Sequence, residues 1–256
     1  MRNVPIFEYL AEAICLALFM VAAGIVATAL DSPGSPLHSW IANADLRRVI
    51  GGIAMGLTAI GLIYSPWGKR SGAHMNPAVT LGFLLLGKIR ARDALFYMAA
   101  QFIGGLVGVL LVLGLFGDAF ATQPVSFAAT MPGTRGVTVA FVAELVISFA
   151  MLFVILHVAA RAKWAPYAGV VAGLLVATYI SVEAPLSGMS MNPARSFASA
   201  APGGLFDNLW IYFVAPPLGM LLAAALFRRR ERARAAVCAK LVHDLSLPCI
   251  HCGHEP

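Results

Sequence analysis

The sequence has little charge for its length. Of 256 residues only 12% are charged, whereas 60% are hydrophobic. Soluble domains are about a quarter charged and about half apolar, so both values depart in the same direction. A chain of this size cannot withdraw so much apolar surface from water by folding alone, which excludes a soluble enzyme and a disordered chain. An integral membrane protein is the class that remains.

Cysteine is scarce as well, and the basic residues are dispersed. The four cysteines are too few and too scattered for a disulfide framework. The formal net charge is +6, but the basic residues fall between apolar segments, whereas a nucleic-acid-binding protein gathers them on one face. The apolar segments also lack clustered carboxylates and a nucleophile beside a base. We therefore expect no nucleic-acid partner, no cofactor and no enzymatic activity.

Long apolar runs are what the sequence has in abundance. A helix that crosses a bilayer needs about 20 mostly apolar residues. Two shorter runs, 77–86 and 193–200, would reach only half-way, because ten helical residues span about 15 Å of a hydrocarbon core about 30 Å thick. The runs long enough to cross are residues 7–30, 47–66, 92–116, 137–160, 165–183 and 207–227.

The basic residues predict how these segments are oriented. Cytoplasmic loops of membrane proteins carry an excess of Lys and Arg. With both termini in the cytoplasm, only Arg47, Arg48, Arg135 and Arg195 of all the Lys and Arg residues fall on the outer side. The basic run 228–234 then forms a stop-transfer anchor at the anionic leaflet. Compact loops suit a plasma membrane, specifically a bacterial inner membrane.

The chain contains an internal repeat. Ala11-Glu12 matches Ala143-Glu144, and the segment 71–79 matches 187–195, with Asn-Pro-Ala in both. Each half has three spans, an odd number, so the second copy is inverted relative to the first. Interrupted segments at corresponding places in two halves indicate a site near the membrane midplane. We expect half-repeats at 1–116 and 137–227, an extracellular connecting loop at 117–136 and a basic cytoplasmic tail at 228–256.

Two triplets, Asn76-Pro77-Ala78 and Asn192-Pro193-Ala194, lie in this six-span frame, and Arg195 directly follows the second. Over about residues 7–227 the chain therefore resembles the aquaporin and glycerol-facilitator family of membrane channels. The resemblance implies an all-α membrane protein with six transmembrane helices and two re-entrant half-helices, arranged as an inverted repeat in a right-handed bundle. It also implies a homotetramer with one pore in each subunit.

The family's function is passive conduction of water, with exclusion of protons and ions. The main cargo can instead be glycerol or another small neutral solute, such as urea, ammonia, hydrogen peroxide or a metalloid hydroxide. An ion-coupled secondary carrier is the alternative class, since inverted repeats and broken helices occur there too.

The triplets suit the start of a half-helix. Proline is preorganised for the first helical position, and asparagine caps the backbone donors of the first turn. In an inverted pair, Asn76 and Asn192 face each other, donate to a passing water and lie where two positive helix-dipole ends converge. Non-helical backbone at this depth must line a wet cavity or be buried. We expect a ladder of pore carbonyls from Gly72, Ala73, His74, Met75, Gly188, Met189, Ser190 and Met191.

The resemblance also implies a four-residue constriction that selects the solute. Three positions carry over as Ile180, Met189 and Arg195, and the second-span position is Met55 or Gly56, with Met55 favoured by the Gly-Leu-Thr that follows it. Strict water channels typically have an aromatic residue and a His at the second-span and fifth-span positions. Glycerol facilitators have an aromatic pair and a Gly. This chain matches neither set, although Ser196, Ala200 and Tyr212-Phe213 favour water.

Two carboxylates fall inside spans, and a cluster of possible metal ligands lies in the tail. We expect Glu12 and Glu144 to accept N–H bonds from the re-entrant loops, with Gln101 in a similar packing role; a proton relay is the alternative. The tail carries Cys249, His251, Cys252 and His254, which are zinc-type ligands in too short a run for a comfortable tetrahedral site. A redox-sensitive or unstructured tail is the other interpretation.

Overall fold

The computed structural model describes residues 5–230 and 238–255, and its regular elements are all helical. Six helices in this part are long and apolar enough to cross a membrane. The predicted all-α fold with six spans is therefore confirmed, with boundaries within a few residues of those expected. The spans are α1 (Ile6–Asp31), α3 (Ala44–Tyr64), α6 (Ala91–Phe116), α8 (Val137–Ala159), α9 (Ala168–Val182) together with the preceding turn from Ala165, and α12 (Trp210–Arg230).

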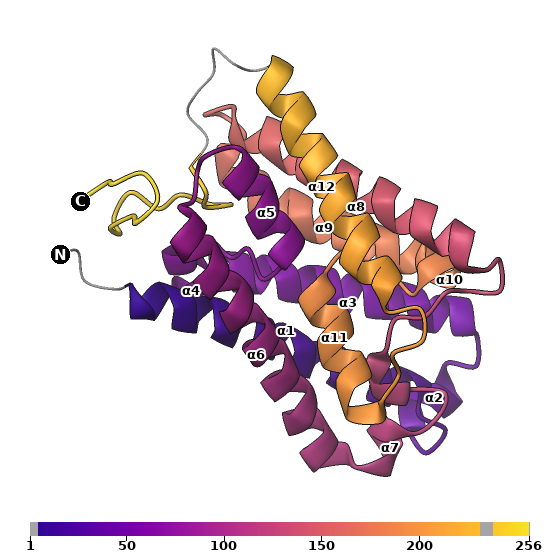
Figure 1. The fold of residues 1–256 in the computed structure, drawn as a ribbon. Coiled ribbons are helices and arrows are strands. Elements are labelled where there is room, and N and C mark those ends of the chain that lie inside the picture. The colour runs from indigo at the N-terminus through magenta and orange to yellow at the C-terminus, as the bar shows by residue number, and fades with distance from the viewer. Residues whose placement is uncertain (1–4, 231–237, 256) are drawn as a thin grey trace.

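Two short helices occupy the places of the predicted half-helices, α5 (Pro77–Leu85) and α11 (Pro193–Ala200). Both lie within the bundle between the long helices (Figure 1). The remaining elements connect the spans: α2 (Pro36–Trp40), α4 (Pro66–Ser71), α7 (Asp118–Ala121), η1 (Ser126–Ala128), η2 (Ala165–Tyr167), α10 (Ala184–Ser187) and η3 (Ala201–Gly203).

Local sequence explains where the half-helices begin. Asn76 and Asn192 are extended at φ −157° and −146°, and each is followed by proline at the first helical position. The Asn76 side chain accepts from the Ala78 N–H at 2.8 Å. The Asn192 side chain accepts from the N–H groups of Ala194 and Arg195 at 3.0 and 3.2 Å. These caps satisfy donors that a helix start leaves without intrahelical partners.

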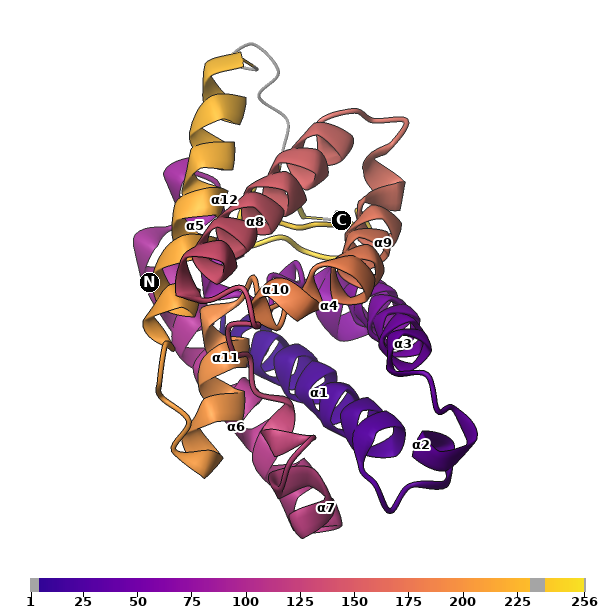
Figure 2. The same cartoon turned by 90° about the vertical axis from the view of Figure 1, so that its right-hand side faces the viewer.

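The long helices pack in three main pairs (Figure 2). In the first half α1 packs on α6, and in the second half α8 packs on α12. The third pair, α3 with α9, joins the two halves. Small residues allow the close approach: a Cβ on Gly104 would lie 2.1 Å from the Ala13 carbonyl oxygen, and one on Gly56 would lie 2.6 Å from that of Gly173. Such contacts are typical of helix packing in membranes.

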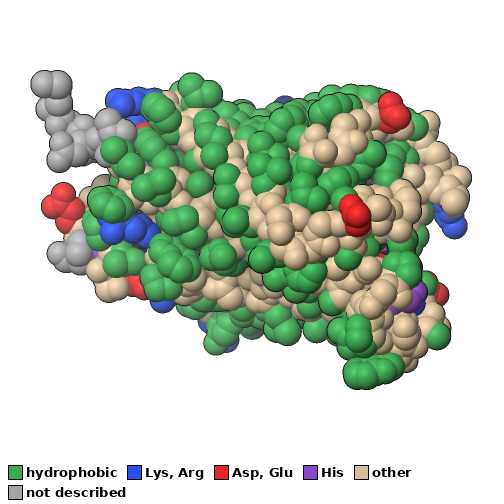
Figure 3. All heavy atoms as spheres, turned by 90° about the horizontal axis from the view of Figure 1, so that it is seen from below, with side chains coloured by type: hydrophobic (Ala, Val, Ile, Leu, Met, Phe, Trp, Pro, Cys, Tyr) green, Lys and Arg blue, Asp and Glu red, His purple; other side chains and the backbone are tan. Residues whose placement is uncertain are grey.

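Apolar side chains also cover the outside of the bundle. Figure 3 shows green side chains over most of the visible face, with most of the blue Lys and Arg side chains toward its ends. Leu57, Leu111 and Leu115 are 63%, 54% and 73% exposed on spanning helices. Exposing such an apolar surface to water is unfavourable, whereas contact with lipid is not. The protein is a multi-pass membrane protein.

Candidate pore

The two half-helices are linked through their capping asparagines. Asn76 Nδ2 donates to the Met191 carbonyl at 2.7 Å, and Asn192 Nδ2 donates to the Met75 carbonyl at 2.7 Å. Each asparagine therefore caps its own half-helix through Oδ1 and binds the opposite loop through Nδ2. A carboxamide carries two N–H donors on that nitrogen. These bonds use one N–H of each asparagine, and both asparagines line the central cavity described below.

Glu12 holds the first re-entrant loop. Its carboxylate is fully buried in α1 and accepts from the N–H groups of His74 and Met75 at 2.9 and 2.7 Å. The Ser71 hydroxyl and Gln101 Nε2 also donate to it, at 2.7 and 2.8 Å. Four donors on one carboxylate satisfy a charge that would otherwise be costly to bury.

Glu144 occupies the same place in the second half. It is fully buried in α8 and accepts from the N–H groups of Ser190 and Met191, both at 2.7 Å. The Ser187 hydroxyl donates to it at 2.7 Å. The inverted repeat thus extends from the sequence to individual hydrogen bonds.

A pair of tyrosines completes this network, and sequence reasoning missed their role. Tyr97 donates to the Ser71 carbonyl at 2.7 Å, and Tyr212 donates to the Ser187 carbonyl at 2.6 Å. Both rings are fully buried. A signal was present in the sequence, because the two tyrosines follow their serine partners by nearly the same separation, 26 and 25 residues.

The loop backbone repeats as well. Gly72 and Gly188 have φ of 105° and 78°, and Met75 and Met191 have φ of 48° and 54°. Left-handed conformations at non-glycine residues are costly and need support from their surroundings, which the buried glutamates supply. The expected carbonyl ladder is partly engaged: Met75 and Met191 bind the opposite asparagine, and the Gly72 carbonyl accepts from Leu241 N at 3.1 Å.

A cavity of about 440 Å³ lies beside these groups. That volume is far above the roughly 10–15 Å³ that one water requires. Its lining includes Arg47 and Arg48 at one end of α3, the two asparagines and, from the tail, Leu241. Ala73, His74, Gly188 and Ser190 from the loops also line it, together with apolar side chains from five of the long helices.

The expected constriction residues all contribute to the lining of this cavity. Met55, Ile180, Met189 and Arg195 all line it. Gly56, the alternative to Met55, instead packs against the Gly173 backbone on α9. Arg195 Nη1 is buried and has no hydrogen-bond partner among the described residues. One guanidinium donor of this cavity-lining residue is thus enclosed by protein without a partner.

The structure groups the tail residues differently from the expected set. Cys249 and Cys252 come together with Cys238 and His243. His251 turns away to Tyr97, with Nε2 3.2 Å from the phenol oxygen, and burial lowers the pKa of His251 to about 4. The other expected ligand, His254, places Nε2 2.8 Å from the Leu245 carbonyl. Spacing alone did not reveal these competing partners.

Comparison with known proteins decides the family. The sequence profile of the major intrinsic protein family matches residues 4–227. The chain belongs to the major intrinsic protein family. The resemblance expected from the two triplets is therefore confirmed.

Members of the major intrinsic protein family from plants and bacteria are similar to this chain. Aquaporin NIP1-2 from Arabidopsis thaliana is 32% identical over 231 residues, which cover 88% of this chain and 74% of that protein. Glycerol uptake facilitator protein-like 6 from Lactiplantibacillus plantarum is 37% identical over 187 residues, covering 72% and 85%. The chain spans 58–63% of the length of three further plant aquaporin relatives.

A solved structure shares the fold of this major intrinsic protein. The X-ray structure of the aquaglyceroporin from Plasmodium falciparum matches with a TM-score of 0.73 at 22% identity, covering 90% of this chain and 98% of that one. At this identity the likeness establishes the fold alone.

Proposed function

We propose that the protein is a passive channel that conducts water and small neutral solutes and excludes protons and ions. The observation that carries this proposal is the pair Asn76 and Asn192, which cap opposed half-helices and line one cavity. Related proteins named aquaporin and glycerol uptake facilitator support the same class.

The mechanism follows from the groups at the cavity. The N-termini of α5 and α11 each carry partial positive charge, which repels cations, including hydronium. The free N–H of each asparagine donates to the oxygen of a central water, so both lone pairs of that water are engaged. A water held in this way cannot accept a proton from its neighbour, and the proton wire is interrupted. Arg195 adds a full positive charge beside the cavity.

An ion-coupled carrier is the weaker alternative. It needs titratable groups that are free to exchange protons in the transport path. Glu12 and Glu144 are occupied by loop donors and do not contribute to the described lining. Two titratable residues do line the cavity, but both are engaged: the His74 ring nitrogens contact Thr80 and the Ala239 carbonyl, and Asp31 pairs with Arg47. Reconstituted vesicles separate the two classes. A channel gives osmotic shrinkage and solute entry that a proton gradient leaves unchanged, whereas a carrier is driven by the gradient.

The nature of the solute depends on the constriction. Met55 and Met189 are flexible and apolar, and they adapt to the shape of a solute. We propose that this ring passes water and is wide enough for a larger neutral solute. A stopped-flow panel of water, glycerol, urea and ammonia identifies the cargo.

Narrowing the constriction will separate water from glycerol. In the double variant Met55→Phe with Ile180→His, we expect glycerol flux to fall while water flux persists, because the ring becomes smaller and gains a polar edge. Both fluxes are measured on the same proteoliposomes. Leu57→Phe is the matched control, since Leu57 is 63% exposed on the outer face of the same helix. If neither flux changes in the double variant, the constriction is assigned wrongly.

The setting of the channel belongs to the same proposal. We propose a plasma-membrane location, as the compact loops suggest. We also propose that both termini are cytoplasmic, because Lys69, Arg70 and the run Arg228–Arg230 lie toward the end of the bundle where the tail folds. A homotetramer with one pore in each subunit is typical of the family, and no enzymatic activity is expected. Mass measurement in detergent tests the tetramer.

A further inference from the structure

The segment 238–255 folds back onto the loop that precedes α5. The Leu241 N–H donates to the Gly72 carbonyl at 3.1 Å, and the Ala239 carbonyl lies 2.6 Å from His74 Nε2. Lys69 pairs with Asp244 at 3.1 Å. The yellow tail runs beside α4 and across the bundle between α5 and α9 (Figures 1 and 2). The tail is therefore bound to the end of the channel at several points.

Four ligand-type side chains converge within this segment. Cys238, His243, Cys249 and Cys252 each offer one ligand atom, and these atoms all lie within 4.8 Å of one another. The Cys238 and Cys249 sulfurs are 3.5 Å apart, and Cys252 Sγ is 3.5 Å from His243 Nε2. Zinc bonds of about 2.3 Å to sulfur and 2.0–2.1 Å to nitrogen place tetrahedral ligand atoms roughly 3.5–3.8 Å apart.

We propose that these four side chains form a structural zinc-type metal site. Three thiolates and one imidazole are a soft ligand set that selects zinc over calcium or magnesium, and four protein ligands leave no open position for catalysis. Cys249 and Cys252 form a Cys-x-x-Cys pair on a turn in which Gly253 N donates to the Cys249 carbonyl at 2.9 Å. Gly253 has φ of 76°, which glycine adopts without strain.

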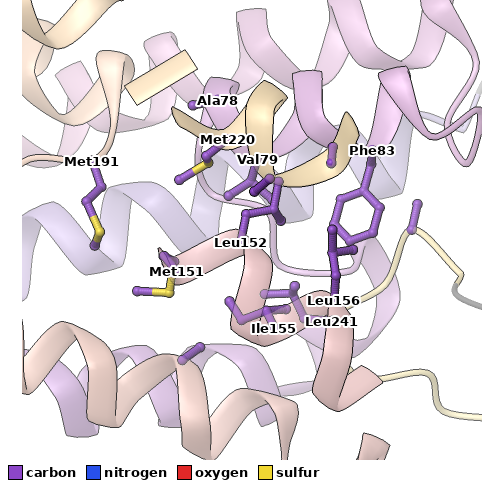
Figure 4. Close-up of a cluster of buried hydrophobic side chains, with 14 of the residues drawn as sticks. Ala78, Val79, Phe83, Met151, Leu152, Ile155, Leu156, Met191, Met220 and Leu241 are labelled. Carbon is purple, nitrogen blue, oxygen red and sulfur yellow. The ribbon is translucent and has the colours of Figure 1, made fainter. Parts of the chain in front are cut away.

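The metal would fix the part of the tail that enters the pore. In the sequence Leu241 lies between the ligands Cys238 and His243. Its side chain is 6% exposed and lines the cavity. It belongs to the same buried cluster as Val79, Ile155 and Leu156 (Figure 4). We infer that the metal-bound tail holds Leu241 in the inner end of the pore and restricts flux, an effect that rests on the proposed channel function.

Metal analysis tests the site without reference to flux. Full-length protein is purified in reducing buffer, loaded with Zn²⁺ and freed of excess. We expect about one zinc per chain, and His243→Ala and Cys252→Ser should weaken binding at least about tenfold. His254→Ala is the matched control and should keep its zinc. Co²⁺ in place of Zn²⁺ should give the intense visible bands and near-ultraviolet charge transfer of tetrahedral thiolate ligation.

Two results would overturn the site. One is wild-type protein that retains no stoichiometric zinc under reducing conditions. The other is loss of zinc from His254→Ala with retention in His243→Ala, which would place the ligands elsewhere in the tail.

Water flux tests the effect on the pore. With zinc, wild-type and His254→Ala vesicles should shrink slowly, and a chelator should accelerate them several-fold. His243→Ala should shrink rapidly with or without zinc, and Leu241→Ala should do so while still binding the metal. Equal flux of wild type with zinc and with chelator would overturn the restriction. If every sample matches protein-free vesicles, the channel function fails, whereas the metal content still decides the site.

Discussion

Replacing Glu144 with glutamine will reduce water flux to nearly that of protein-free vesicles. The carboxylate accepts from Ser190 N, Met191 N and the Ser187 hydroxyl. A glutamine amide turns one acceptor into a donor, which then faces a backbone N–H and leaves it unsatisfied. A buried unsatisfied donor costs about 1–3 kcal/mol, and the same change removes the charge that strengthens the remaining bonds. The loop that places Met191 and Asn192 will no longer hold its left-handed turns.

Glu183→Gln is the matched control for this variant. Glu183 is a buried carboxylate near the same loop, and neither of its oxygens has a hydrogen-bond partner among the described residues. We expect it to conduct as wild type does. Flux is measured by stopped-flow light scattering with a zinc chelator present, and circular dichroism checks the helical content. Wild-type flux in Glu144→Gln would show that the glutamate does not support the pore.

Replacing Gly104 with alanine will destabilise the bundle. A Cβ at this position would lie 2.1 Å from the Ala13 carbonyl oxygen and 2.6 Å from the Ala13 Cα. Because these are backbone atoms, no side-chain rotation relieves the contact, and α1 must separate from α6. Overpacking costs typically 1–3 kcal/mol, and a backbone clash belongs at the upper end of that range or above it. We expect a large fall in the apparent melting temperature in detergent.

Gly114→Ala makes the same change on the same helix where space is open. Nothing lies within 4 Å of a Cβ built on Gly114. Alanine has a helix propensity about 1 kcal/mol better than glycine, so this variant should be as stable as wild type or slightly more stable. Thermal unfolding of both variants is compared side by side. Equal melting temperatures would mean that α1 and α6 are packed less tightly than the structure shows.

The fold was predictable because its signals are local. Each span is an apolar run of the length that a bilayer requires. Each half-helix begins at an Asn-Pro pair whose capping and backbone preferences act within a few residues. The matching halves then required inversion, since three spans return the chain to the opposite side.

The exact partners in the pore were less predictable because they depend on contacts across the chain. Met75 and Met191 were expected among the pore carbonyls, but each also accepts from the asparagine of the other half. Such pairings connect residues more than a hundred positions apart, and only the folded inverted repeat brings them together. The residues beside them in the sequence do not indicate which carbonyl accepts the hydrogen bond from the asparagine.

The tail shows most clearly that the spacing of residues in the sequence cannot predict which side chains meet. His251 lies between Cys249 and Cys252 in the sequence, but the buried Tyr97 and the Ser71 carbonyl hold its ring away from the thiols. His243 and Cys238 lie earlier in the chain, outside the short run, and complete the cluster because the segment folds back on itself. Several possible ligands in a short run of sequence predict that a site exists, but they do not predict which residues form it.

Stopped-flow osmotic shrinkage of proteoliposomes that contain the full-length protein tests the channel most directly. The sample is treated with a zinc chelator and measured at several temperatures. We predict shrinkage much faster than that of protein-free vesicles, with an activation energy close to that of water self-diffusion and no proton leak. Correctly folded protein that shrinks no faster than empty vesicles, or only with their high activation energy, would contradict the account.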